Sequence, residues 1–111
     1  MVTWDQIRKI ALKLPGVEEG TSYGTAALKI KGKFFCRLKE DGKSVVFRVG
    51  FDERDLLMQT KPGVFFITDH YLGYPAVLIR LATATRKEAA DIIEMSWRFV
   101  APKKLQAARD A

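Results

Sequence analysis

Hydrophobic periodicity changes from helical to alternating and back along this chain, and no other feature of the sequence constrains its fold as much. Near the amino terminus, Thr3 and Gln6 have the spacing of a capping box. Apolar residues then recur every three or four positions, at Ile7, Ile10, Ala11 and Leu14. The pattern predicts an amphipathic helix over residues 3–14, which ends at a proline followed by a glycine.

Two-residue alternation follows a polar connection at residues 17–24. Apolar residues alternate with lysines over 28–30, which predicts a half-buried strand. The same period predicts strands over 33–39 and 45–49. Because the turns between these three strands are short, we expect them to pair as an antiparallel meander.

Alternation also assigns the two faces of the second strand. The side chains expected to face the core are Phe34, Cys36 and Leu38. The opposite face then carries Phe35, Arg37 and Lys39.

The second half of the chain again combines helical and strand patterns. Residues 53–60 have the pattern of a short helix, and near-continuous apolar runs predict strands over 64–67 and 76–81. A second capping box, at Thr85, precedes an apolar stripe that predicts a helix up to Pro102.

The predicted order is helix, three strands, helix, two strands, helix, with a possible tail helix near residues 103–109. Helices packed against an antiparallel sheet define the α+β class. The length of 111 residues, with 48% hydrophobic and 29% charged side chains, is that of one globular domain spanning residues 1–111.

The composition excludes several kinds of site. One cysteine cannot form an intramolecular disulfide, and one histidine with one cysteine cannot supply four zinc ligands. No apolar run approaches the ~20 residues of a membrane span, and the glycines form no nucleotide-binding loop. We therefore expect no metal, cofactor or membrane partner. The first residues lack the segments of a signal peptide, which predicts a cytoplasmic protein.

Basic residues are concentrated between positions 28 and 50. The chain has 19 Lys and Arg against 13 Asp and Glu, a formal net charge of +6 at pH 7. The basic residues of this segment are Lys29, Lys31, Lys33, Arg37, Lys39, Lys43 and Arg48. Alternation predicts that most of them share one sheet face, namely Lys29, Lys31, Arg37, Lys39 and Arg48.

Such a face could contact the phosphate backbone of DNA with little or no sequence specificity. Base reading is not expected, because no helix has a basic, amide-rich face. The alternative is a solvated face whose charges serve solubility.

Two loops contain every tyrosine and the single histidine of the chain. The residues that could form a polar pocket there are Ser22, Tyr23, Asp69, His70 and Tyr74. If the loops meet, they could bind a small molecule or a peptide. If they do not, these side chains cap their own loops. Asp69 and His70 are adjacent and their side chains diverge in an extended chain, so we expect a protein that is not an enzyme.

Several short motifs, in order and spacing, resemble the MmcQ/YjbR family over nearly the whole chain. The segments that resemble it are Leu14–Glu19, Lys31–Phe35, Asp69–Pro75 and Trp97–Lys103. The resemblance implies a small, single-domain bacterial protein of α+β type.

The family is described as having a double-wing arrangement suggestive of DNA binding. The resemblance maps these wings onto the strand hairpins, with Lys29, Lys31, Lys33, Arg37 and Lys39 as candidates for backbone contacts. This chain departs from the family where a tryptophan usually precedes the last strand, because Tyr74 and Pro75 occupy that position. The oligomeric state is not indicated by the sequence.

Overall fold

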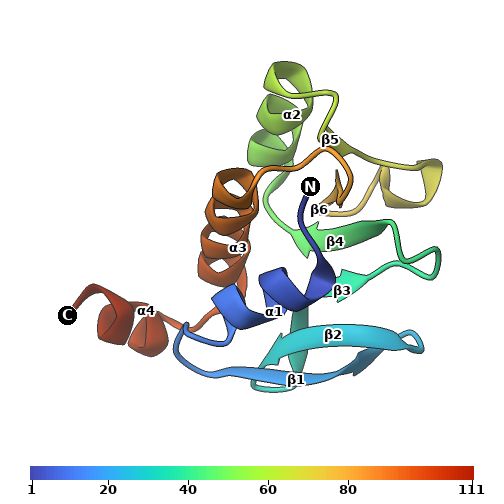
Figure 1. Ribbon diagram of the computed structural model, residues 1–111. Coiled ribbons are helices and arrows are strands. Elements are labelled where there is room, and N and C mark those ends of the chain that lie inside the picture. Colours follow the sequence, from blue (N-terminus) through green and yellow to red (C-terminus); the bar gives the residue numbers. More distant parts are fainter.

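The computed structural model describes residues 1–111 and contains one six-stranded antiparallel sheet with four α-helices (Figure 1). The helices are α1 (Trp4–Ala11), α2 (Phe51–Thr60), α3 (Arg86–Val100) and α4 (Lys103–Asp110), with a 3-10 turn η1 (Asp69–Tyr71). The strands are β1 (Val17–Ser22), β2 (Thr25–Ile30), β3 (Lys33–Leu38), β4 (Ser44–Arg48), β5 (Phe65–Phe66) and β6 (Ala76–Arg80). Their order in the sheet is β1-β2-β3-β4-β6-β5. The α+β prediction is confirmed, and so is the antiparallel meander, now β2-β3-β4.

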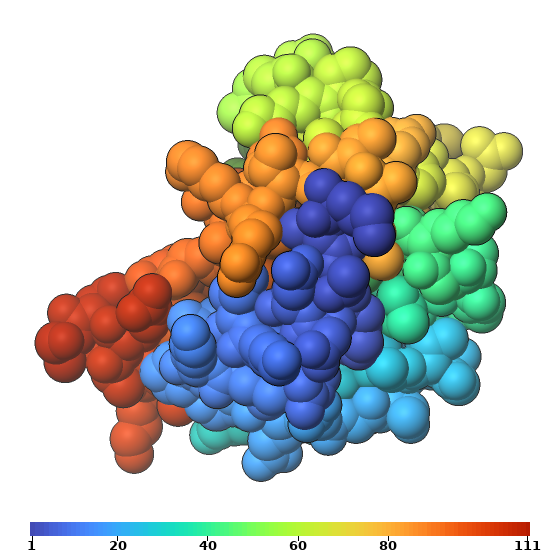
Figure 2. Space-filling view, in the orientation of Figure 1, coloured from blue at the N-terminus to red at the C-terminus, as the bar shows by residue number.

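The main core lies between one face of the sheet and helices α1 and α3. Ile7 of α1 and Trp97 of α3 are fully buried against strand side chains such as Phe47. The indole of Trp97 also donates a hydrogen bond to the carbonyl of Pro15 (3.0 Å), which ties α3 to the end of the first helical segment. Figure 2 shows this covered side, with the amino-terminal residues in blue over its centre. None of the helices is both long and apolar enough to cross a bilayer.

The opposite face, which we call the open face, carries a second and smaller cluster. Neighbouring residues of β4 alternate, so Val45 and Phe47 belong to the main core while Val46 belongs to the second cluster. Tyr71 of η1 packs there with Val46 and Leu78. The loop containing η1 therefore covers part of the open face.

Residues 17–24, predicted as a connection, instead contain the edge strand β1. It pairs residue for residue with β2, from Val17 opposite Ile30 to Ser22 opposite Thr25. Most of β1 is exposed, so its side chains are polar and show no alternation of hydrophobic character. That is why the period of the sequence gives no signal for this strand.

The predicted facing of β3 is wrong for its two phenylalanines. A register shift between Leu28 and Lys29 of β2 leaves one extra residue in β3, a β-bulge. Phe35 and Cys36 consequently both enter the main core, and Phe34 shares the open face with its cross-strand partner Lys29. The carbonyl of Phe35 accepts a hydrogen bond from the buried hydroxyl of Ser96 (2.8 Å).

Helix boundaries differ slightly from the predictions. α1 ends at Ala11 rather than at residue 14, and α2 begins two residues earlier than predicted, after Gly50 as its N-cap. In α2 the one buried residue is Arg54, while Leu56 is 60% exposed. The tail helix is present as α4.

The capping box of α3 carries a charge that links fold stability to pH. Thr85 and Glu88 bond reciprocally, with the Glu88 carboxylate accepting from the Thr85 N–H (2.8 Å). Lys61 forms an ion pair with the same carboxylate (3.0 Å). The Thr85 N–H, and after it Lys61, lower the pKa of Glu88 below its ordinary value of 4.5.

A folded-state pKa below the unfolded value stabilises the fold above about pH 4.5, and this contribution is lost as the pH falls through the lowered pKa. Glu88→Gln should therefore destabilise the protein at pH 7, with a difference from the wild type that shrinks at pH 3. Urea denaturation at both pH values measures this. Asp91→Asn, at an exposed position of the same helix, is the control. A Glu88→Gln difference that does not depend on pH would contradict the assignment.

Candidate functional site

A pocket of about 160 Å³ lies on the open face, between the β1-β2 hairpin and the loop that contains η1. Its lining consists of Tyr23, Phe34, Arg37, His70, Tyr71 and Tyr74. In Figure 1 the β1-β2 turn, the β3-β4 turn and η1 follow one another along the same side of the molecule. The two tyrosine-containing loops therefore meet, although more than forty residues of chain separate them.

One wall of the pocket belongs to the hairpins. The rings of Tyr23 and Phe34 meet edge to face, with their centroids 6.3 Å apart and an interplanar angle of 87°. The other wall belongs to the η1 loop, where Tyr71 lies edge to face with both His70 (4.9 Å) and Tyr74 (6.1 Å). The pocket thus offers aromatic surface on both sides.

Arg37 joins the two walls. Its guanidinium donates hydrogen bonds to the hydroxyl of Tyr71 (3.0 Å) and to the Glu40 carboxylate (2.9 Å). It also donates to the hydroxyl of Thr25 (3.3 Å) and lies 5.1 Å from the centroid of the Tyr23 ring. Each wall is therefore in contact with the same guanidinium.

Burial acts against the charge of Arg37, whose side chain is only 7% exposed. Desolvation is the largest influence and lowers the pKa of Arg37, but the hydrogen bonds to Glu40 and Tyr71 outweigh it, so the pKa is raised overall. The pKa of Glu40 is lowered by its backbone N–H and by Arg37. This ion pair keeps Arg37 charged. The N–H groups of Arg37 are directed at other side chains of the protein.

Arg54 of α2 fixes the backbone of the η1 loop by hydrogen bonds. One of its terminal nitrogens donates to the carbonyls of Tyr71 (3.2 Å), Leu72 (3.0 Å) and Tyr74 (3.3 Å). The residue is 7% exposed. The carbonyls of Tyr71 and Tyr74 also accept backbone N–H bonds, from Tyr74 and Ala76, so the buried guanidinium adds a charged donor that draws the three carbonyls together. Arg54 therefore holds the backbone from which two pocket side chains project.

The family model for YjbR matches residues 12–99, which include every residue that lines the pocket. This chain belongs to the YjbR family. Uncharacterized proteins Mb2600 of Mycobacterium bovis and Rv2570 of Mycobacterium tuberculosis are similar to it, each 28% identical over 120 residues. The alignment with each covers 95% of this chain and 93% of the relative.

The fold of this YjbR protein is shared by a solved structure. The crystal structure of Deinococcus radiodurans protein DR2400, which has a DUF419 domain, superposes with a TM-score of 0.76 at 19% sequence identity. The match covers 94% of this chain and 82% of that one. At this identity the similarity supports the fold and carries no information about the pocket.

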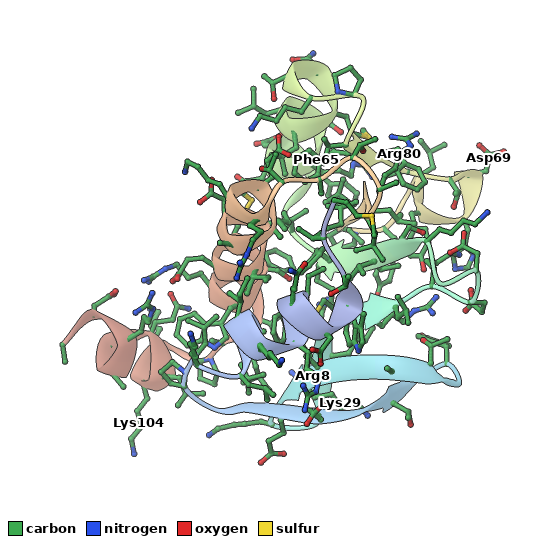
Figure 3. The ribbon with its side chains drawn as sticks, in the orientation of Figure 1. Arg8, Lys29, Phe65, Asp69, Arg80 and Lys104 are labelled. Atoms are coloured by element: carbon green, nitrogen blue, oxygen red, sulfur yellow. The ribbon has the colours of Figure 1, made fainter.

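Three of the five pocket candidates in the sequence line the pocket of this YjbR protein, namely Tyr23, His70 and Tyr74. Ser22 lies beside the hairpin turn, and its carbonyl accepts a hydrogen bond from the Thr25 hydroxyl (3.1 Å). Asp69 is exposed on the outer side of η1 and does not line the pocket (Figure 3).

Phe34, Tyr71 and Arg54 were not among those candidates. Because of the β-bulge, the alternation of the sequence assigns Phe34 to the wrong face of the sheet. In the sequence Arg54 is one of several charged residues of a short helix, and only its contacts with η1 reveal its role.

The seven basic candidates are divided among several places. Lys29 and Arg48 lie on the open face with Arg37, and the Arg48 guanidinium stands 6.0 Å from the Phe34 ring and 5.7 Å from the Phe99 ring. The ammonium of Lys39 is 5.6 Å from the Tyr71 ring centroid. The three exposed members lie at the ends of hairpins. Lys31 is in the β2-β3 turn and Lys33 begins β3 beside it, while Lys43 is in the β3-β4 turn at the opposite end. The cations near the pocket are thus Lys29, Arg37, Lys39 and Arg48.

The three carbonyl contacts predict that Arg54 stabilises the η1 loop. Arg54→Met should lower the free energy of unfolding by about 2–3 kcal/mol, because buried carbonyls lose a charged donor. It should also increase hydrogen exchange in residues 69–75. Urea denaturation and exchange mass spectrometry measure the two effects. Arg86→Met, at an exposed position, should change stability by less than about 0.5 kcal/mol. Unchanged exchange in the loop of Arg54→Met would refute the role of this residue.

Proposed function

We propose that this YjbR protein binds single-stranded nucleic acid and takes one unpaired base into the aromatic pocket. The observation that carries the proposal is the pocket lining, in which all side chains except Arg37 are aromatic rings. Proteins bind unpaired bases mainly by stacking them on aromatic side chains, and this interaction tolerates any base. A pocket with aromatic surface on both sides suits a flat ring.

Cations beside the pocket would contact the flanking phosphates. Lys29 is the cross-strand partner of Phe34, and its ammonium makes no ion pair or hydrogen bond within the protein. The Arg48 guanidinium is likewise without a carboxylate or carbonyl partner, and its Nε is buried and unpaired. Lys39 lies over the ring of Tyr71, and its ammonium is 3.6 Å from the exposed Glu40 carboxylate, which Arg37 shares. These three side chains provide positive charge next to the stacking surface.

The open face suits a single strand better than a duplex. A duplex needs a continuous basic surface, but η1 covers part of this face and Tyr71 packs on its apolar strand residues. Arg37, the central cation of the predicted basic face, is buried and bonded to Glu40 and Tyr71. The proposal therefore concerns a strand whose bases are free, with phosphate contacts as a secondary source of affinity.

A second candidate is a small planar ligand or an aromatic side chain of a peptide. The pocket volume of about 160 Å³ favours it, because so small a cavity accepts little more than one ring. The two functions differ in salt dependence. Only a ligand with several phosphates releases counterions when it binds.

We expect a labelled thymidine oligomer of about ten nucleotides to bind with a log–log salt slope near about −2, from three phosphate contacts at about −0.7 each. Fluorescence anisotropy at several salt concentrations measures affinity and slope.

Phe34→Leu should weaken binding about tenfold with the slope unchanged, because it removes a stacking surface. The double variant Lys29→Glu with Lys39→Glu should weaken binding and flatten the slope.

Lys104→Glu is the control for a charge reversal away from the pocket, since Figure 3 shows Lys104 on the far side of the molecule from Asp69 of η1. It should leave affinity almost unchanged. The nucleic-acid proposal fails if the wild-type protein does not bind the oligomer at low salt. It also fails if Lys104→Glu weakens binding as much as the double variant does.

A further inference from the structure

The β1-β2 and β2-β3 hairpins have turns of the same type, and the first of these turns carries a residue of the pocket. Tyr23-Gly24 joins β1 to β2, and Lys31-Gly32 joins β2 to β3. In both turns the two central residues have positive φ, at 52° and 79° in the first and 51° and 81° in the second. Two-residue hairpins with this geometry strongly favour asparagine, aspartate or glycine at the first position.

A tyrosine is an unfavourable residue for that position. A bulky side chain in the left-handed region brings its Cβ close to the backbone carbonyl, whereas asparagine tolerates the conformation and glycine avoids the contact. Tyr23 and Lys31 are the only residues other than glycine with positive φ in this chain. Since β1 and β2 need only a turn here, the fold itself gives no reason for an aromatic residue.

The Tyr23 ring recovers little of this cost by burial, because the residue is 76% exposed. Its contacts are the edge of Phe34 and the guanidinium of Arg37. The backbone conformation nevertheless brings the ring back over the open face, where it forms the outer part of the hairpin wall. An exposed aromatic surface at the rim of an aromatic pocket is available to a ligand.

We propose that Tyr23 is the residue on which the bound base stacks, and that it is retained in a strained turn at the expense of fold stability for this contact. Residues in sparsely populated backbone regions cluster at binding sites for the same reason. The proposal rests on the proposed function, and it deepens that function by naming the ligand's principal contact and the class of group that makes it, an unpaired planar base.

The test replaces Tyr23 with the residue that the turn prefers. Tyr23→Asn should raise Tm by about 2–5 °C, because asparagine relieves the left-handed backbone. The same variant should weaken binding of the thymidine oligomer about tenfold, because the stacking surface is gone. Tyr23→Phe should keep both the wild-type Tm and an affinity within about twofold, because the ring remains. Thermal denaturation and fluorescence anisotropy measure the two properties.

Lys31→Asn is the control for the backbone effect, because it places asparagine at the equivalent position of the β2-β3 turn, where φ is nearly the same. It should raise Tm by a similar amount. Affinity should stay within about threefold of the wild type, because the variant loses at most one phosphate contact.

The outcomes separate this proposal from the proposed function. If the wild-type protein binds the oligomer and Tyr23→Asn binds it equally well, the role of Tyr23 is refuted while nucleic-acid binding stands. If Tyr23→Asn weakens binding but also lowers Tm, the retention of a strained turn is refuted. If the wild-type protein does not bind the oligomer, both proposals are refuted.

Discussion

The buried guanidinium of Arg37 is the interaction on which the open face of the sheet depends. A charge removed from water is unfavourable unless ion pairing and hydrogen bonds replace its hydration. Here the replacement comes from three segments that are separate in sequence, through Thr25 of the β1-β2 hairpin, Glu40 of the β3-β4 turn and Tyr71 of η1. Because a single planar group satisfies all three, it also fixes their relative positions, and the pocket is the space left between them.

The two faces of the sheet are consequently stabilised by different forces. Helices α1 and α3 cover one face through apolar packing around Trp97 and Phe47. On the other face, the η1 loop is held by the guanidinium groups of Arg37 and Arg54, with only a small apolar cluster beneath Tyr71. Directional polar contacts position side chains more narrowly than apolar packing does, which suits the face that carries a pocket.

Sequence patterns predicted the elements whose causes are local. The capping boxes at Thr3 and Thr85 were identified correctly, because capping depends on residues three apart. Strand β1 was missed because an exposed edge strand needs no apolar alternation, and the facing of Phe34 was wrong because the bulge depends on pairing with β2. Alternation also placed Arg37 on the open face, but its burial depends on Glu40 and Tyr71, which only the tertiary structure brings together. For the same reason the sequence could not predict whether the two tyrosine-containing loops meet.

The open edge of the sheet has a consequence for how copies of this chain meet in concentrated solution. Strand β1 presents unpaired backbone groups beside the pocket, and Glu18 and Glu19 are both exposed along it. Glu19 is paired with Arg8 of α1, so the carboxylate without an ion-pair partner on this edge is that of Glu18. Two copies that joined their sheets through β1 would bring the Glu18 side chains of both copies into the same seam, and repulsion between them would oppose growth of a continuous intermolecular sheet. An unpaired glutamate on the exposed edge strand thus acts against fibrous aggregation at the edge next to the pocket.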